Sequence, residues 1–249
     1  MFESARKNKT TDIIINKIRT AILEGKLQPG DRLPPEKVLG EQFEVSKQTL
    51  RESLRALEHM GLIIMRKGAN GGAFIVEVEE HIATQNLANY LYFKNLTIEN
   101  LSELRRILEP HAAKCAAEEM SSKDLLLLEN INKETRKYLE QEDWVQVTQT
   151  EIEFHCLIAR QTKNPILILI LDFVENLLDD YKKILKPDSE FMNRVLSYHD
   201  IIYEAILNKD GEKASQEMLN HVLDVEKYLA QLKEEKQGGK LWQNCLQSS

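Results

Sequence analysis

Apolar residues recur at helical spacing along almost the whole chain of 249 residues, and only one short stretch has the pattern of β-strands. In that stretch, two apolar and β-branched runs at 62–66 and 73–78 flank the glycine-rich segment 67–72. This arrangement predicts a β-hairpin. Because strand patterns are missing elsewhere in the sequence, it predicts a mainly α fold with one hairpin near residue 70.

Three helices are predicted before this hairpin. The first covers residues 11–24 and has apolar residues at helical spacing along one face. The second opens at the proline pair 34–35, since proline suits the first turn of a helix. The third begins after Ser46, a favourable N-cap, and runs to about residue 60. Three helices followed by a hairpin form a winged helix-turn-helix, which we assign to residues 1–78.

From about residue 79 onward, amphipathic helical segments follow one another with short polar connections. Their predicted bounds are 81–93, 97–119, 122–140, 143–162, 165–186, 189–208 and 210–235. Such a series indicates a helical bundle. We therefore expect an all-α domain of about seven helices over residues 79–236 and a flexible tail over residues 237–249.

Charge is divided unevenly between the two predicted domains. Residues 1–78 carry 13 Lys and Arg against 10 Asp and Glu, a net charge of +3, whereas the remainder carries 20 against 30, a net charge of −10. Only the first domain is therefore suited to face phosphate groups. No apolar run approaches the roughly 20 residues that cross a bilayer, and the N-terminus lacks the apolar segment of a signal peptide. We expect a cytoplasmic protein that does not bind membranes.

The third predicted helix has two contrasting faces. Leu50, Leu54 and Leu57 recur at helical spacing and should face the domain core. The opposite side carries long polar side chains, namely Lys47, Gln48, Arg51 and Arg55. Glutamine can pair with adenine, and arginine or lysine can bind guanine or phosphate. A cationic face on an isolated helix would more simply be solvated, but the preceding turn and the following hairpin favour a DNA-recognition helix.

The first domain resembles a known family. The segments RLPPEK (32–37), VSKQTLRESLRAL (45–57) and GLI (61–63) are similar to those of the GntR family of bacterial regulators, and the resemblance covers nearly all of residues 10–78. It implies binding to double-stranded DNA. The contacts that it implies are Lys37, Lys47, Gln48, Thr49, Arg51, Lys67 and Gly68.

Three histidines and a glutamate of the second domain lie where the helical pattern has apolar residues. Glu151 and His155 are one turn apart on one face, and His199 and His221 each interrupt an apolar stripe. A buried carboxylate is normally paired or bound to metal, whereas a single inward histidine is more often a hydrogen-bonded core residue. Four such residues from three helices favour a divalent cation. Imidazole and carboxylate suit Zn, Ni, Fe or Mn, of which we expect Zn first.

The second domain also has a family resemblance. The segments LRRILEP (104–110), EIEFH (151–155), YHDIIYEAI (198–206) and MLNH (218–221) resemble the FadR branch of GntR regulators, whose helical ligand-binding domain is called FCD. The resemblance implies a metal held by Glu151, His155, His199 and His221, with open positions for an effector, often an organic acid. Glu151 stands where Asp is usual in the family.

Arg105 shares an apolar helix face with Leu101 and Leu108, and we expect it to point inward. A buried guanidinium needs an anion as a partner. That partner is either an internal carboxylate, such as Glu109 or Glu175, or the carboxylate of an effector, which a guanidinium can bind through two hydrogen bonds. We favour the second and predict Arg105 as an effector-binding residue.

These features together predict a DNA-binding transcriptional regulator that is not an enzyme. A homodimer is expected because two winged helices read the two half-sites of a pseudo-palindromic operator. A small carboxylate bound at the metal would change the affinity for DNA. Two alternatives stay open. One is a regulator whose metal is structural or missing and whose effector binds elsewhere, and the other is a metal-dependent hydrolytic enzyme, because a metal with an open position can activate water.

Overall fold

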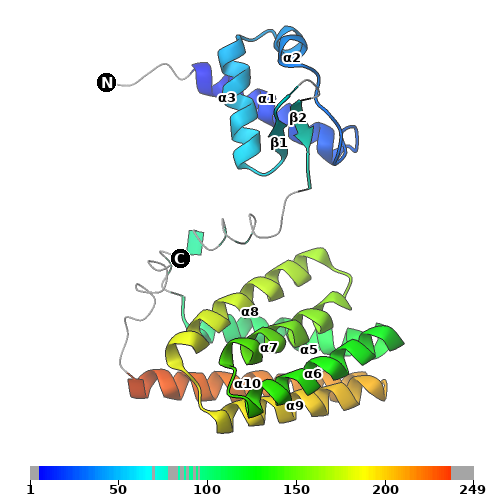
Figure 1. Ribbon diagram of the computed structural model, residues 1–249, viewed down its shortest axis with the longest axis vertical. Coiled ribbons are helices and arrows are strands. Elements are labelled where there is room, and N and C mark those ends of the chain that lie inside the picture. The colour runs from blue at the N-terminus through cyan, green and yellow to red at the C-terminus, as the bar shows by residue number, and fades with distance from the viewer. Residues whose placement is uncertain are drawn as a thin grey trace. The chain divides into compact units, whose positions relative to one another are not determined.

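The computed structural model describes residues 6–68, 71–77 and 96–236, together with residues 84, 87, 90, 91 and 94. The chain divides into two compact units, residues 1–88 and 89–249, and each is described by itself (Figure 1). The predicted domain boundary after residue 78 and the predicted tail lie outside the described residues, and so does most of the helix predicted over 81–93.

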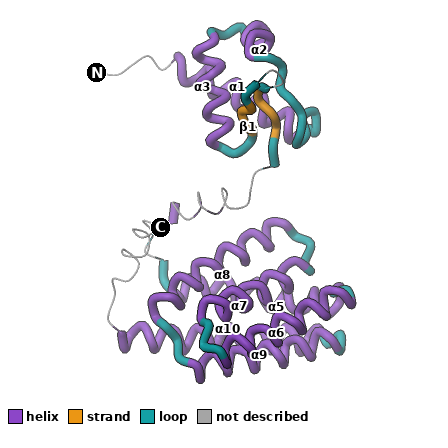
Figure 2. Tube along the Cα trace, in the orientation of Figure 1, coloured by secondary structure: helices purple, strands orange, loops and turns teal. Residues whose placement is uncertain are grey.

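The N-terminal unit is the predicted winged helix-turn-helix (Figure 2). Its elements are α1 (Arg6–Leu23), α2 (Glu36–Phe43), α3 (Lys47–His59), β1 (Ile63–Arg66) and β2 (Gly72–Ile75). The two strands pair antiparallel, with Ile63 opposite Ile75 and Arg66 opposite Gly72. Strand β2 ends at Ile75, whereas the apolar pattern predicted an end at residue 78, which is not among the described residues.

The small core of this unit forms as the apolar spacing predicts. Leu50, Leu54 and Leu57 of α3 are buried and pack with Ile14 and Ile18 of α1. Burying an aliphatic side chain of this size contributes about 1.5–3 kcal/mol. Because this face of α3 is fixed against α1, the polar face of α3 is held outward.

The C-terminal unit is a bundle in which six helices are described (Figure 1). They are α5 (Ile98–Glu119), α6 (Ser122–Glu140), α7 (Trp144–Arg160), α8 (Pro165–Leu185), α9 (Ser189–Leu207) and α10 (Gly211–Lys236). Helices α5 to α9 begin after polar N-caps, which satisfy free amide groups of the first turn: Thr97, Ser121, Asp143, Asn164 and Asp188. Within the described part of the chain, no helix has both the length and the apolar character that a membrane span needs.

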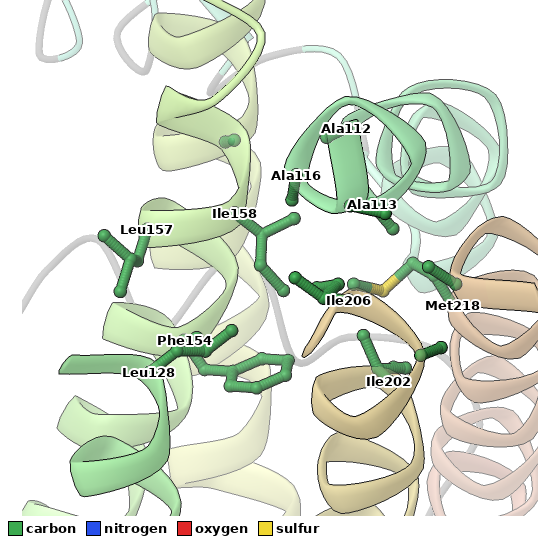
Figure 3. Packing of buried hydrophobic residues seen from close by; sticks show 14 of the residues in the cluster. Ala112, Ala113, Ala116, Leu128, Phe154, Leu157, Ile158, Ile202, Ile206 and Met218 are labelled. Atoms are coloured by element: carbon green, nitrogen blue, oxygen red, sulfur yellow. The ribbon is translucent and has the colours of Figure 1, made fainter. Parts of the chain in front are cut away.

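Apolar side chains of all six described helices, α5 to α10, form the bundle core (Figure 3). Ala112 and Ala116 on α5 leave room for larger side chains such as Ile158, Ile206 and Met218. Such close packing fixes the rotation of each helix about its axis. The polar residues on the same helices are therefore held in defined positions.

Candidate metal centre and DNA-binding surface

Three histidines from different helices meet inside the C-terminal unit. His155 lies on α7, His199 on α9 and His221 on α10, and all three are buried. One ring nitrogen of each lies within 4.8 Å of the others, and Nε2 of His155 is 3.3 Å from Nε2 of His221. Two nitrogens bound to one tetrahedral zinc ion lie about 3.3 Å apart, because each Zn–N bond is about 2.0–2.1 Å long. The spacing therefore fits a shared divalent cation.

The surroundings of His199 and His221 keep both imidazoles neutral. Burial lowers the pKa of each side chain well below its usual value, and the charges of neighbouring groups lower it further. Among the described residues, neither ring nitrogen of His199 has a hydrogen-bond partner, and neither does Nδ1 of His221. Neutral imidazoles with free lone pairs are the form that binds metal ions.

A carboxylate on α5 orients His155. Oε2 of Glu109 lies 3.0 Å from Nδ1 of His155, while Nε2 of the same ring faces His221. Burial raises the pKa of Glu109, but the attraction of Arg105 and His155 outweighs this effect and holds the pKa below its ordinary value. An ionised carboxylate behind a metal-binding imidazole is a common arrangement, because it fixes the ring and its tautomer.

Arg105 is buried, and its guanidinium contacts carboxylates of the protein itself. Its Nε contacts Glu109 and lies 2.8 Å from Oε1 of Glu175. Burial lowers the pKa of Arg105, but attraction to these two carboxylates raises it overall. The internal carboxylates are thus the partners of Arg105 in this structure. Its Nη2 also lies 3.4 Å from Nε2 of His155, at the edge of the histidine cluster, and a direct contact with an effector stays a prediction.

Glu151 is buried one turn before His155, but it does not join the three imidazoles. Its Oε1 accepts a hydrogen bond of 2.6 Å from Nζ of Lys182 on α8. Its Oε2 has no hydrogen-bond partner among the described residues. The structure therefore brings three of the four predicted ligands together and pairs the fourth with a lysine.

Lys182 did not emerge from the sequence pattern, although α8 contains a signal that indicates it. Helix α8 is apolar over most of its surface, yet four charged residues recur along it at intervals of three or four: Asp172, Glu175, Asp179 and Lys182. All four are buried. Charged residues at helical spacing in a buried helix indicate internal ion pairs or a binding site.

A cavity of about 450 Å³ lies beside this ion pair. Its lining includes apolar side chains of α7 and α9, among them Trp144, Ile152 and Met192. Lys182 is one of its lining residues, whereas Arg105 is not among the described residues that line it. Lys182 thus carries a buried ammonium group and borders a space large enough for a small organic molecule.

The polar face of α3 is exposed in the N-terminal unit. Ser46 caps the helix by accepting a hydrogen bond of 3.2 Å from the amide of Thr49, and Lys47 and Gln48 are exposed beside the cap. Thr49 itself is buried, and its hydroxyl lies 2.9 Å from Oγ of Ser46. Arg51 is exposed and lies 2.9 Å from Oε2 of Glu36 on α2. The ammonium group of Lys47 and the side-chain amide of Gln48 therefore lie near the start of α3, whose outer face is exposed to solvent.

Thr49 is thus the one predicted DNA contact that is buried, and the remaining predicted contacts are at the surface. Lys37 is exposed on α2, and Lys67 and Gly68 are exposed at the end of β1. Gly68 has a φ of 104°, a backbone conformation that residues other than glycine rarely adopt. The glycine thus permits the tight turn at the tip of the wing.

Two protein families match separate parts of the chain. Residues 10–75 match the family described as bacterial regulatory proteins, gntR family, and residues 100–224 match the FCD domain. The HTH-type transcriptional regulator LutR of Bacillus subtilis (strain 168) is 32% identical over 214 residues, which cover 84% of this chain and 96% of that protein. The chain belongs to the GntR family.

Two further comparisons agree with this assignment. The galactonate operon transcriptional repressor of Escherichia coli (strain K12) is 30% identical to this GntR regulator over 227 residues, 86% of this chain and 94% of that protein. A solved structure of Streptococcus agalactiae GntR matches with a TM-score of 0.62 at 23% identity, covering 89% of this chain and 99% of that one, and so supports the fold. The predicted winged helix, FCD domain and regulatory function are confirmed, and the relatives are regulators rather than enzymes.

The neutral histidines predict a pH dependence for the metal-free GntR regulator. Since the pKa values of His199 and His221 are lowered by folding, the unfolded chain binds more protons than the folded chain below about pH 6.5. The free energy of unfolding should therefore fall as the pH drops through this value, by up to about 1.4 kcal/mol per pH unit for each histidine.

Urea unfolding in the presence of a chelator, followed by circular dichroism at roughly pH 5 to 8, measures this slope. A variant with both His199→Leu and His221→Leu serves as the control and should have a shallower slope. An equal slope in the two proteins would contradict the assignment of the proton uptake to these imidazoles.

Proposed function

We propose that this GntR regulator binds a divalent cation in its FCD domain and that a small carboxylate effector, bound there, controls its affinity for operator DNA. His155, His199 and His221 would hold the cation, with Glu151 as the fourth ligand. The observation that carries this proposal is the convergence of three buried imidazoles, whose ring nitrogens lie within 4.8 Å of one another. Buried polar atoms normally have partners, and a cation would supply them.

The donor set fits such a cation. The converging ring nitrogens of His155, His199 and His221 and the unpartnered Oε2 of Glu151 are the donor types that zinc takes, and nickel, iron and manganese accept them too. Glu109 would hold the ring of His155 in place, as it does in the structure. A bound divalent cation would supply positive charge and open coordination positions for a carboxylate.

An organic acid is the class of effector that we propose. The cavity of about 450 Å³ beside Lys182 has room for a small molecule, and a cationic side chain lies on its wall. One relative is the repressor of a galactonate operon, and galactonate is itself a carboxylate. Arg105, at the edge of the histidine cluster, remains a proposed second contact for such an acid.

Regulation requires two arrangements of the protein that the effector distinguishes. We propose a cytoplasmic homodimer in which two winged helices contact the half-sites of a pseudo-palindromic operator. An effector that binds one arrangement more tightly than the other changes the affinity for DNA, typically by about 1–3 kcal/mol.

Metal analysis combined with DNA binding tests the proposal. The purified protein is analysed for bound metals by mass spectrometry, stripped with a chelator and titrated with Zn²⁺. DNA affinity is then measured by fluorescence anisotropy on a duplex selected by the protein from a random library, with and without galactonate. One cation per chain and a change of about 5-fold or more in DNA affinity with galactonate support the proposal. A tightly bound cation without a change in DNA affinity would indicate a structural metal and contradict control by the effector. A chain that binds no cation would overturn the proposal.

Replacing Arg51 with alanine should weaken DNA binding by about 10–100-fold, which corresponds to about 1–3 kcal/mol for a guanidinium that contacts a base edge. The side chain is exposed on α3, and its ion pair with Glu36 is at the surface, so its loss should hardly affect folding. The measurement is fluorescence anisotropy on the selected duplex.

Arg19→Ala on the exposed face of α1 is the matched control, since it removes the same charge from the same domain. It should reduce the affinity much less than Arg51→Ala does. Equal losses in the two variants would contradict a specific role of Arg51 in base recognition.

A further inference from the structure

Lys182 is a buried cation with one ion-pair partner among the residues that the structure describes. Its side chain is 8% exposed, and its Nζ lies 2.6 Å from Oε1 of Glu151. Removing a buried ammonium group from water is unfavourable unless an anion compensates it. The carboxylate of Glu151 therefore holds Lys182 in its observed position.

Glu151 has a second possible use, because it lies one turn before His155 on the same helix. The carboxylate oxygens of Glu151 are not within the group of donor atoms formed by the three imidazoles, so its side chain must turn to reach a cation there. Its free Oε2 indicates that the ion pair with Lys182 leaves part of its bonding capacity unused. A carboxylate that binds a divalent cation has less negative charge left to compensate an ammonium group.

When Glu151 turns toward the histidines, Lys182 loses its anion. Asp179, three positions before Lys182 on α8, is engaged through Oδ2 with Nζ of the exposed Lys183 at 2.6 Å, and its Oδ1 has no hydrogen-bond partner among the described residues, Lys182 included. The cavity of about 450 Å³, which Lys182 lines, is the place from which a new anion can arrive.

We propose that Lys182 is an effector-binding residue that is made available by the metal: it neutralises Glu151 in the metal-free protein, and it holds the carboxylate of the effector once Glu151 binds the cation. This inference rests on the proposed function and assigns a residue to the recognition of the effector. The cavity lies alongside Trp144, Ile152 and Met192, so the ligand class is an organic acid whose carbon skeleton contacts these side chains.

The exchange of partners makes the binding of metal and of carboxylate mutually favourable. The cation draws Glu151 away from Lys182, which leaves Lys182 free for the effector. The effector's carboxylate occupies Lys182, which leaves Glu151 free for the cation. Such coupling is reciprocal. A carboxylate should thus raise the affinity for Zn²⁺, and Zn²⁺ should raise the affinity for the carboxylate by the same factor.

Lys182→Met is the test, because methionine keeps an unbranched apolar side chain and removes the charge. Without the ion pair, Glu151 is free to bind the cation, so the affinity for Zn²⁺ should rise about tenfold or more in competition with a chromophoric chelator. In the wild-type protein, either galactonate or 4-methylpentanoate should raise the affinity for Zn²⁺, and the variant should lose this effect. Lys182→Gln, which can still donate a hydrogen bond to Glu151, repeats the measurement if the methionine variant folds poorly.

Lys183→Met is the matched control, since Lys183 lines the same cavity but pairs with Asp179 instead of Glu151. It should leave the affinity for Zn²⁺ within about twofold of the wild type. An unchanged or lower affinity for Zn²⁺ in Lys182→Met overturns the inference. The role of Lys182 in holding the effector is overturned if the carboxylates still raise the affinity of Lys182→Met for Zn²⁺. It is also overturned if they do not raise the affinity of the wild type. In both cases the wild type still binds Zn²⁺, whereas a wild type that binds no cation would refute the proposed function itself.

Discussion

Replacing Arg105 with methionine should lower the free energy of unfolding of the FCD domain by about 3–5 kcal/mol, because it leaves buried carboxylates without a cation. Arg105 is 1% exposed and contacts Glu109 and Glu175, which are also buried. Burial already raises the pKa of Glu175, and only the attraction of neighbouring cations, of which Arg105 is the strongest, opposes this effect. Chemical unfolding followed by circular dichroism at neutral pH measures the loss.

Arg106→Met on the same helix is the control for this substitution. Arg106 lies 2.6 Å from Glu226, but its side chain is 35% exposed, so water replaces much of the lost interaction. Its removal should cost no more than about 1 kcal/mol. If Arg105→Met had as small an effect as Arg106→Met, the ion pairs of Arg105 with Glu109 and Glu175 would not stabilise the domain as predicted.

His199→Leu should abolish tight metal binding while leaving the metal-free protein at least as stable as the wild type. Both ring nitrogens of His199 are buried without hydrogen-bond partners among the described residues, so an apolar side chain of similar size removes two unsatisfied groups. The affinity for Zn²⁺ should fall by more than about 100-fold, since even the loss of a group behind a metal ligand costs about 10–100-fold. Chelator competition measures the affinity, and thermal unfolding measures the stability.

His111→Leu is the matched control, because His111 is exposed on α5 and lies outside the histidine cluster. Its affinity for Zn²⁺ should equal that of the wild type. If His199→Leu bound Zn²⁺ as tightly as the control does, the convergence of the three imidazoles would be a feature of packing alone.

The local pattern of the sequence was sufficient to predict the fold. Leu50, Leu54 and Leu57 recur at helical spacing and are buried, and the glycines near residue 70 correctly indicated a hairpin. These features depend on residues close together in the sequence, where the period of apolar positions identifies the secondary structure. Precise ends are less predictable, as the earlier end of β2 at Ile75 shows.

The pairing of charges inside the bundle could not be predicted in the same way. The sequence indicated that Glu151, His155, His199 and His221 point inward, and all four are buried. It could not show that Glu151 pairs with a lysine 31 positions away, because that contact depends on how α7 and α8 are rotated against each other. The same limit applies to Arg105: its inward position did not reveal its partner, and the prediction from the sequence favoured an effector where the structure shows Glu109 and Glu175.

The cation that we propose at His155, His199 and His221 would have a consequence for the amount of regulator in a cell. A cation that binds only the folded chain shifts the folding equilibrium toward it, by about 2.7 kcal/mol when the free ion is at 100 times its dissociation constant. Unfolded chains are substrates for proteases, and a change of about 1–2 kcal/mol can alter protein abundance several-fold. We therefore expect bacteria deprived of the cation to contain fewer copies of this regulator, so that its target genes respond to metal starvation even when the level of the organic acid stays constant.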